Sequence, residues 1–484
     1  MSLSQRILSN TAFQIVARVV ASVGNFVVFI LINRHLTEEA FGRYTYYITA
    51  FYLAGNFINF GANGIAIREV ARGGGAEGTI LGGVARFKTI TALLAVAFIT
   101  ALAFVYEETA PSRLLVVLAS LHLFCHALST PLVSFHARLR FALPSVAQIV
   151  GTLAFLATAL VAYGLGCRSP EVYLILYGVG NIVQSFIIFV ASRPLVRLRF
   201  DQTLAEFAAF FREMVPIGLS AVAASLYMYM DTLILRELKG ETAVGHYNEA
   251  YRLLMFALMV PQFFTQVLFP VLSRYHESEH GLFALLLKRA LLYLLLCGSP
   301  LAVALQFLSL NVLHGLYRAP SAETVQVLQI LGWATLCIFA AYPFITALTA
   351  ARRQLDFMKI AILAGIVNLV LNLLWIPSYG ILGAAWATVV TEGLVLVLSI
   401  TALLRVTLFN PFSIELWKVP VATLAVGLVA CLVREWGLLP ALGTAAAGLV
   451  GVLLVLRCLP VDLLRGAPPT DRIAAESFGD NLPS

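Results

Sequence analysis

The chain alternates long apolar stretches with short polar connections. Most of the apolar stretches reach the roughly 20 residues that a helix needs to cross a hydrocarbon core of about 30 Å. They cover residues 10–33, 41–66, 80–105, 113–136, 143–165, 171–192, 214–235, 247–272, 285–307, 324–350, 357–376, 381–404, 419–433 and 438–457. We therefore predict an all-α integral membrane protein with fourteen transmembrane helices, of which the thirteenth is the shortest.

Two of these stretches carry the same polar stripe. Gly42 and Tyr44 precede the first copy, and Gly245 and Tyr247 precede the second at the same spacing. In an unbroken helix the members of each stripe fall within about 80° of one face. Because lipid cannot satisfy such a face, we expect both stripes to line a wet interior or a helix contact. The members are Thr45, Thr49, Tyr52, Asn56, Asn59 and Asn63 in the first copy, and Asn248, Arg252, Met255, Met259, Gln262 and Gln266 in the second.

Further matches extend the repeat through each half of the chain. Ala137-Arg138 recurs as Ala351-Arg352, and a proline precedes each pair inside its span. Six spans return the chain to the same side of the membrane, so the halves should be parallel repeats related by an axis along the membrane normal. The predicted units are an N-terminal six-helix lobe (1–192), a cytoplasmic interfacial linker (193–213), a C-terminal six-helix lobe (214–404), accessory helices 13–14 (405–465) and a disordered cytoplasmic tail (466–484).

The linker contains a short amphipathic pattern. Asp201 is predicted to cap a helix that carries Leu204, Phe207 and Phe211 on one side. Such a helix is expected to lie on the membrane surface and to tie the two halves together.

Composition and charge agree with a membrane protein. The 484 residues are 60% hydrophobic and 12% charged, against roughly 25% charged residues in soluble proteins. The segments predicted to lie inside hold more than twice as many lysines and arginines as the outside loops, which places both termini in the cytoplasm. The net charge of +7 is therefore assigned to this asymmetry and not to nucleic-acid binding. The N-terminal segment leads into a span too long for a cleavable signal, and the 6 cysteines form no CxxC pair, so no metal site is expected.

Five segments of the chain carry the pattern of a known family. LTEEAFGRY at 36–44 resembles the first outside loop of O-antigen-type polysaccharide flippases, and GANGIAIREVAR at 61–72 resembles the exit of their second span. VGHYNEAYRL at 244–253, after Met230-Asp231, resembles the entry to their second half. FPVLSR at 269–274 and YGILGAAWAT at 379–388 complete the set, which covers the chain from about residue 5 to residue 410.

The chain is thus similar to the Wzx-like branch of the multidrug/oligosaccharidyl-lipid/polysaccharide (MOP) exporter superfamily. The resemblance implies two six-helix lobes around a central cavity that opens alternately to each side. It also implies a polyprenyl-diphosphate-linked oligosaccharide as cargo, moved from the inner to the outer leaflet of a bacterial or archaeal cytoplasmic membrane for polysaccharide biosynthesis. The implied partners are this glycan, membrane lipids and polysaccharide polymerase machinery, and we expect a monomer. The more basic first-lobe signatures of the peptidoglycan-precursor branch are not found here.

An anionic diphosphate requires cations inside the cavity. Arg18 lies in the middle of the first span, where an arginine costs roughly 2.5–3.5 kcal/mol on insertion scales, so a ligand or a neighbouring helix must satisfy it. Arg252 lies on the repeated polar face, with a snorkelling interface anchor as the alternative. Amide side chains suit sugar hydroxyls, although hydrogen bonds between helices would also explain them. The predicted cavity residues are Arg18, Gln14, Asn25, Asn56, Asn59, Asn63, Arg252, Gln262 and Gln266.

Other charged residues permit docking or coupling roles. The positive-inside rule is the simpler account of the cations at cytoplasmic ends, with docking of the lipid diphosphate as the alternative; they are Arg68, Arg86, Lys88, Arg274 and Lys359. Asp231 and Glu392 are candidates for proton coupling, or for structural pairs such as Asp231 with Arg236 or Arg252. His122 and His126, on one face of the fourth span with His136, are candidates for proton coupling or ordinary packing histidines. No cofactor is expected beyond a proton or sodium gradient.

Two other functions remain in view. A cation-coupled multidrug exporter of the same superfamily should have an acidic cavity, whereas the charges in the middle of the spans are mainly basic here. A membrane-embedded glycan-transferring enzyme should have acidic catalytic pairs and a large outside loop, and the chain has neither a DxD motif nor such a loop. We therefore expect a transporter and not an enzyme.

Overall fold

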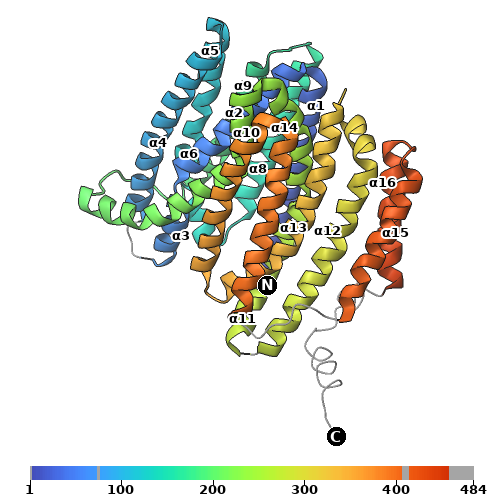
Figure 1. Ribbon diagram of the computed structural model, residues 1–484. Coiled ribbons are helices and arrows are strands. Elements are labelled where there is room, and N and C mark those ends of the chain that lie inside the picture. Colours follow the sequence, from blue (N-terminus) through green and yellow to red (C-terminus); the bar gives the residue numbers. More distant parts are fainter. Residues whose placement is uncertain (1–2, 74–76, 279, 406–413, 457–484) are drawn as a thin grey trace.

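The computed structural model describes residues 3–73, 77–278, 280–405 and 414–456, and nearly all of these are helical (Figure 1). The predicted tail at 466–484 lies outside the described residues. The helices are α1 (Leu3–His35), α2 (Glu38–Asn59), α3 (Ala62–Ala71), α4 (Glu77–Tyr106), α5 (Ala110–Ser120), η1 (Leu121–Phe124), α6 (Cys125–Leu128), α7 (Leu132–Ala137), α8 (Ala142–Gly164), α9 (Pro170–Ser192), α10 (Leu204–Ala257), α11 (Met259–Ser278), α12 (His280–Leu316), α13 (Ala322–Ala350), α14 (Gln354–Leu404), η2 (Ile414–Trp417), α15 (Lys418–Val433) and α16 (Leu438–Val455).

The all-α membrane architecture is confirmed. Within the described residues, 11 helices are long and apolar enough to cross a membrane. Two of them contain a sharp turn at a glycine with positive φ, Gly240 in α10 and Gly380 in α14. The hydrogen bonds from Tyr247 to Asp231 and from Asn368 to Thr391 show that the two arms of each helix pack antiparallel as a hairpin. The total of fourteen spans stays a prediction.

Three predicted spans are not single helices. The second span breaks where Phe60 (φ 36) and Gly61 (φ 75) adopt left-handed conformations, which separates α2 from α3. The fourth span is divided into α5, η1, α6 and α7, with turns around Pro131. The eighth ends at a turn at Leu258, where α11 begins. The alignment of each stripe on one face assumed an unbroken helix, and this assumption fails near the end of each copy, because local backbone turns interrupt the helical period.

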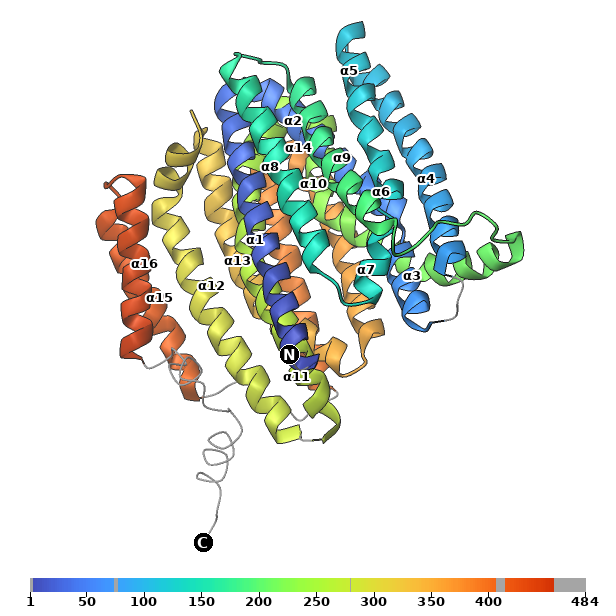
Figure 2. The same ribbon diagram turned by 180° about the vertical axis from the view of Figure 1, so that it is seen from behind.

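The linker differs from its prediction in the residue that caps its helix. Thr203 and Glu206 form a reciprocal capping box at the start of α10, so Asp201 is not the cap. Asp201 instead accepts a hydrogen bond from Thr79 Oγ1 (2.8 Å), and this contact lowers the pKa of its carboxyl. Phe207 packs against Phe87 of α4, so the apolar side of the helix covers the ends of α3 and α4 (Figure 2).

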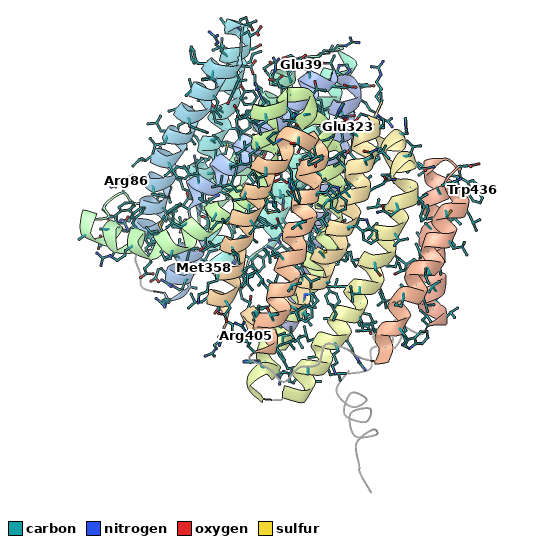
Figure 3. All side chains as sticks on the ribbon, in the orientation of Figure 1. Glu39, Arg86, Glu323, Met358, Arg405 and Trp436 are labelled. Atoms are coloured by element: carbon teal, nitrogen blue, oxygen red, sulfur yellow. The ribbon has the colours of Figure 1, made fainter. Side chains whose placement is uncertain are left out.

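The helices of each half of the chain contact one another. In the first half α1 packs on α8, α8 on α9, and α4 on α5; in the second half α12 packs on α13 and α13 on α14, while α15 packs on α12. The two halves meet mainly where α2 lies along α10. We call the end that carries Glu39, Glu323 and Trp436 the upper end, and the end that carries Met358 and Arg405 the lower end (Figure 3). The charge asymmetry of the loops predicts that the upper end lies outside.

The repeat-related glycines bring the two halves together at the upper end. A Cβ atom added to Gly42 would lie 1.8 Å from the Glu241 carbonyl oxygen, and one added to Gly245 would lie 2.9 Å from the Glu38 carbonyl oxygen. Such distances allow no side chain, so both glycines are required for this close approach. Parallel repeats place equivalent residues face to face across their common axis, as Gly42 and Gly245 are here.

We predict that Gly42→Ala opens the upper end. The added methyl group overpacks the contact, at a cost of about 1–3 kcal/mol, which favours separation of the halves. The measurement is labelling of a cysteine at Thr49 by an impermeant thiol reagent from the upper side, in a chain whose 6 native cysteines are replaced. Gly64→Ala is the matched control, because no atom lies within 4 Å of its added Cβ. Equal labelling in both variants would contradict the prediction.

Candidate functional site

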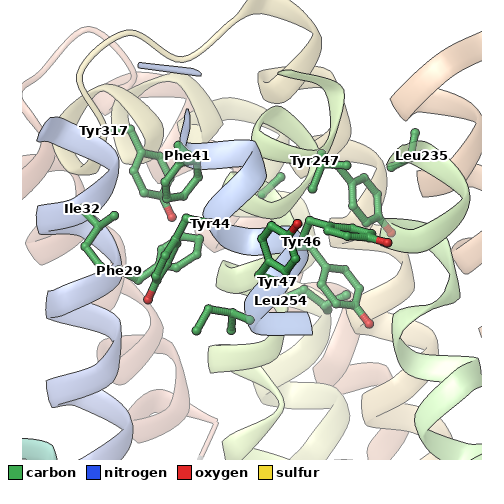
Figure 4. Close-up of a cluster of buried hydrophobic side chains, with 14 of the residues drawn as sticks. Phe29, Ile32, Phe41, Tyr44, Tyr46, Tyr47, Leu235, Tyr247, Leu254 and Tyr317 are labelled. Atoms are coloured by element: carbon green, nitrogen blue, oxygen red, sulfur yellow. The ribbon is translucent and has the colours of Figure 1, made fainter. Parts of the chain in front are cut away.

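Aromatic side chains from both halves fill the space beneath the upper contact. Phe29 of α1 lies against Phe41 of α2 (ring centroids 5.0 Å apart) and against Tyr317, which follows α12 (6.3 Å). Tyr247 of α10 is completely buried in the same cluster (Figure 4). Burial of this apolar surface seals the upper end between the halves.

Arg43 is the centre of an ion-pair network at the upper end. Within the first half it lies 3.2 Å from Glu107 and 3.6 Å from Glu171, and it reaches across to Glu241 of α10 at 3.0 Å. Burial raises the pKa of the Glu107 carboxyl, while Arg43 and the Tyr47 hydroxyl pull it down. Arg236 neutralises the other oxygen of Glu241 at 3.0 Å. The ion pairs therefore hold the two halves together at the same place where Gly42 and Gly245 allow their backbones to approach closely.

The end of α1 makes two further contacts with the second half. Asn33 Nδ2 donates to Glu249 Oε1 at 2.7 Å, with both side chains buried. Arg34 donates to the carbonyl oxygens of Gly315 (2.5 Å) and Leu316 (2.6 Å) at the end of α12. Together with Arg43, these bonds close the upper end in this conformation.

A cavity of about 290 Å³ lies below the closed upper end, between the halves. Among the described residues that line it, Arg252 is the cation, and none is a carboxylate. The other lining residues are amides, hydroxyls, aromatic rings and a few apolar side chains. They are Asn25, Phe29, Tyr44, Thr45, Ile48, Thr49, Tyr52, Phe155, Tyr177, Tyr229, Asn248, Tyr251 and Met255.

Arg252 faces this cavity from α10. Its guanidinium carbon lies 4.9 Å from the centre of the Phe29 ring, a cation–π contact. Tyr52 of α2 also interacts with it. The structure therefore places Arg252 in the interior and not at the membrane interface, and the upper three members of both stripes line the same cavity.

Three of the lower members of the stripes are exposed, whereas Asn59, Asn63 and Met259 are partly buried. Asn56 continues the cavity-facing side of α2 and is exposed, as are Gln262 and Gln266 on α11. Gln262 also contacts the Tyr342 hydroxyl of α13. Thr45 and Thr49 on the same face of α2 are buried, so exposure along this face increases toward the lower end.

The predicted residues of α1 divide between the cavity and its approach. Asn25 lines the cavity. Arg18 is exposed and lies about two turns farther toward the lower end, and Gln14 is partly buried and lies about three turns farther. Arg18 is close enough to His136 of α7 to interact with it electrostatically. The structure thus separates Arg18 from Arg252, and no ion pair of Arg18 occurs in the described residues.

Asp231 forms a buried polar site in the second half. Its carboxylate accepts hydrogen bonds from Asn372 Nδ2 (2.6 Å), the Tyr247 hydroxyl (2.7 Å) and Thr388 Oγ1 (3.1 Å). The side chain is 4% exposed. Asn372 Oδ1 is buried without a hydrogen-bond partner in the described structure. The predicted structural pair with Arg236 or Arg252 is wrong, because Arg236 binds Glu241 and Arg252 faces the cavity.

The other candidates for coupling have neutral partners. Glu392 accepts a hydrogen bond from the Tyr227 hydroxyl at 2.7 Å. His122 is buried between the rings of Phe51 and Tyr177, with Nδ1 2.6 Å from the Ala119 carbonyl oxygen. His126 contacts Asn59, and the broken fourth span removes His136 from the face that His122 and His126 were predicted to share.

The five cations predicted for docking differ in their partners and in their exposure. Arg68 pairs with Glu69 and Glu213, and Arg86 donates to the Phe200 carbonyl oxygen at 2.5 Å. Arg274 and Lys359 are exposed on the second half, with Arg274 over the Tyr275 ring. Lys88 is only 1% exposed, so it is not available for docking at the surface.

Sequence reasoning missed two groups of residues. The acidic partners of Arg43 come from loops and helices far apart in the chain, and no local pattern connects them. Asn368 and Asn372 had a signal, because two asparagines one turn apart in an apolar span should share a buried face.

The fold and the cavity define a class, a membrane protein of two helical lobes around a polar interior, the MOP architecture. A lipid II flippase, MurJ, in an inward closed conformation aligns with a TM-score of 0.75 and 17% identity over 93% of this chain and 99% of that one. An inward-facing multidrug resistance MATE transporter of the MOP superfamily aligns with a TM-score of 0.60 and 14% identity, over 80% and 93% of the two chains. At such identities the likeness shows the fold.

The chain belongs to the polysaccharide biosynthesis protein family, whose model matches residues 7–276. It is 22% identical over 203 residues to the capsular polysaccharide biosynthesis protein CapF of Staphylococcus aureus, covering 42% of this chain and 51% of that one. It is 26% identical over 199 residues to an uncharacterised membrane protein of Methanocaldococcus jannaschii, covering 40% and 46%. The chain thus spans about half the length of these curated relatives.

We predict that Glu241→Gln loosens the upper end. The substitution removes the charge that Arg43 and Arg236 share across the halves, at a cost of about 1–2 kcal/mol for a pair that is partly screened by solvent. Distances between spin labels at Ser112 and Thr242 should become longer and broader. Glu39→Gln is the control, because Glu39 is 69% exposed and 3.8 Å from Arg43. A distance distribution like that of the wild type in Glu241→Gln would refute the role of the ion pair.

Proposed function

We propose that this protein is a flippase for a polyprenyl-diphosphate-linked oligosaccharide. In this proposal the head group enters the cavity from the lower end, and the halves then rock so that the upper end opens. Cargo moves from the inner to the outer leaflet for cell-surface polysaccharide biosynthesis. The observation that carries the proposal is a cavity between two lobes that contains Arg252 and no carboxylate.

The chemistry of the cavity suits such a head group. Arg252 offers a guanidinium that binds phosphate oxygens in bidentate geometry. Asn25 and Asn248 supply amides for sugar hydroxyls. Tyrosine rings such as Tyr52 and Tyr229, which stack with centroids 6.0 Å apart, present flat surfaces with a polar edge. In this proposal Asn56, Gln262 and Gln266 offer further amides to the head group on its way from the lower end to the cavity. Arg18 lies along the same path.

The same lining argues against export of cationic drugs. A cationic drug needs a carboxylate or a similar anion in the site, because burying an unpaired charge is costly. Asp231 is enclosed by Asn372, Tyr247 and Thr388 and does not line the cavity. Drug export is therefore the alternative that the transport experiment below must exclude.

We also propose a location, an orientation and an oligomeric state for the protein. We place it in the cytoplasmic membrane of a bacterium or archaeon, with both termini in the cytoplasm and the upper end outside. It works as a monomer, in contact with membrane lipids and alongside polysaccharide polymerase machinery. The six-helix lobes at 1–192 and 214–404 are the moving bodies, and the segment at 193–213 connects them.

We also propose that Asp231 couples transport to an ion gradient. A buried carboxylate with neutral donors and no cation in the described structure can hold a proton or Na⁺. The unpaired Asn372 Oδ1 beside it supplies a further oxygen ligand for a hard cation. Glu392, on the same arm of α14 as Thr388, is a second position for a proton.

We predict that Arg252→Ala stops flipping. Loss of a charge-assisted contact to the diphosphate should reduce transport about tenfold or more. In cells depleted of the protein, labelled polyprenyl-diphosphate sugars should accumulate in the inner leaflet, and only the wild type should restore their exposure outside. Arg18→Ala should impair entry, and Arg434→Ala is the control, because Arg434 is an exposed arginine at the upper end. Normal outside exposure in depleted cells would refute the flippase proposal in favour of drug export.

We predict that Asp231→Asn removes the dependence on the driving gradient. The amide has nearly the same shape but cannot carry the charge that binds a proton or Na⁺. Transport into vesicles should lose its response to an imposed proton or sodium gradient, and the gradient that drives the wild type identifies the ion. Glu323→Gln, an exposed acid at the upper end, is the control. A gradient response of the Asp231→Asn variant equal to the wild type would exclude Asp231 as the coupling site.

A further inference from the structure

Lys88 is a buried lysine in a membrane helix without a carboxylate partner. Its side chain is 1% exposed, and its Nζ donates to Asn63 Oδ1 at 2.8 Å. In the described residues no ion pair of Lys88 occurs. An ionisable group inside a membrane protein is costly and is retained where it has a function. The proposed transport mechanism does not use this lysine.

A chain of hydrogen bonds leads from Lys88 to His126. Asn63 Nδ2 donates to Asn59 Oδ1 at 3.4 Å, and Asn59 Nδ2 lies 3.2 Å from His126 Nδ1. The chain joins α4, α3, α2 and α6 inside the first half. Gly55 makes room for the imidazole, since an added Cβ there would lie 2.9 Å from His126 Nε2.

Two groups determine the direction of this chain. Lys88 does so at one end, and the Gly55 carbonyl oxygen does so at Asn59, since it accepts from Asn59 Nδ2 at 3.0 Å. A protonated ammonium only donates, so Asn63 must turn its oxygen toward Lys88 and its amide nitrogen toward Asn59. Asn59 in turn must present its oxygen to Asn63 and its nitrogen to the ring. His126 Nδ1 is then an acceptor, and the neutral ring carries its proton on Nε2.

The opposite charge state requires the opposite direction. When His126 is doubly protonated, Nδ1 donates, so Asn59 must turn its oxygen to the ring and its nitrogen to Asn63. This turn also gives up the hydrogen bond from Asn59 Nδ2 to the Gly55 carbonyl oxygen. Asn63 must then turn its nitrogen toward Lys88, which can accept only as a neutral amine. Flipping of both amides therefore accompanies loss of the proton from Nζ and gain of one at Nδ1.

We infer that Lys88 and His126 form a proton-binding site that holds one positive charge at either end of an amide chain, but not at both. His122 of η1 is the other titratable group that interacts with His126, and no carboxylate interacts with either residue of the pair in the described structure. Because Asn59 and Asn63 connect Lys88 to His126 inside the first half, the position of the proton determines which way both amides are turned there.

The experiment is side-chain ¹⁵N NMR of histidine in the full-length protein over a range of pH. In the wild type, His126 should be neutral, with its proton on Nε2, at pH values where exposed histidines are cationic. Lys88→Met should raise the midpoint of His126 protonation by about one pH unit or more, a tenfold change in proton affinity. Lys359→Met is the matched control, because Lys359 is exposed.

Asn59→Leu separates the amide chain from simple repulsion between the two cations. It cuts the chain but leaves Lys88 bound to Asn63, so our inference expects the His126 midpoint to rise by a similar amount. It also tests the inference if Lys88→Met does not fold. Asn56→Leu, on the same helix face but outside the chain, should leave the midpoint unchanged. A proton on Nδ1 of neutral His126 in the wild type, or an unchanged midpoint in Asn59→Leu, would overturn the inference.

Discussion

The close contact between α2 and α10 determines how the two halves of the protein are joined. Two backbones approach at Gly42 and Gly245 to distances that exclude any side chain. In a membrane, helices gain little from hydrophobic burial against one another, so close packing and polar contacts must hold them together. This contact fixes the axis between the halves, and thereby places Tyr44 and Arg252 on opposite walls of one cavity.

Three ionisable side chains of the interior, Arg252, Asp231 and Lys88, lie in separate places. The cation Arg252 faces the cavity, the carboxylate of Asp231 is enclosed within the second half, and Lys88 is enclosed within the first. Each has neutral partners in place of an opposite charge. A direct pair of Arg252 with Asp231 would neutralise both residues and leave neither available for cargo or ion. The structure thus keeps Arg252 and Asp231 apart, although a structural ion pair between them was one of the interpretations of the sequence.

Sequence and structure agree most closely where helical periodicity is unbroken. Thr45, Thr49 and Tyr52 line the cavity as their spacing predicts, and so do their counterparts Asn248 and Arg252. Agreement ends at Phe60 and Leu258, where turns interrupt the helices. Lys88 was expected at an accessible cytoplasmic end, because lysines and arginines near the end of a span usually lie at the membrane surface. Here α3 and α6 cover it, which no pattern within α4 reveals.

Hydropathy, the placement of lysine and arginine and the 3.6-residue period are local properties of the chain, so they predict the membrane class, the helical repeat and the polar faces. Which charges meet depends on how the helices pack. Arg43 forms ion pairs with Glu107, Glu171 and Glu241, which come from three separate segments. Asp231 accepts hydrogen bonds from Asn372 and Thr388, which lie on the two arms of a helical hairpin. Partners so distant in the chain depend on how helices pack in three dimensions, and helix packing depends on many small contacts that a one-dimensional pattern does not contain.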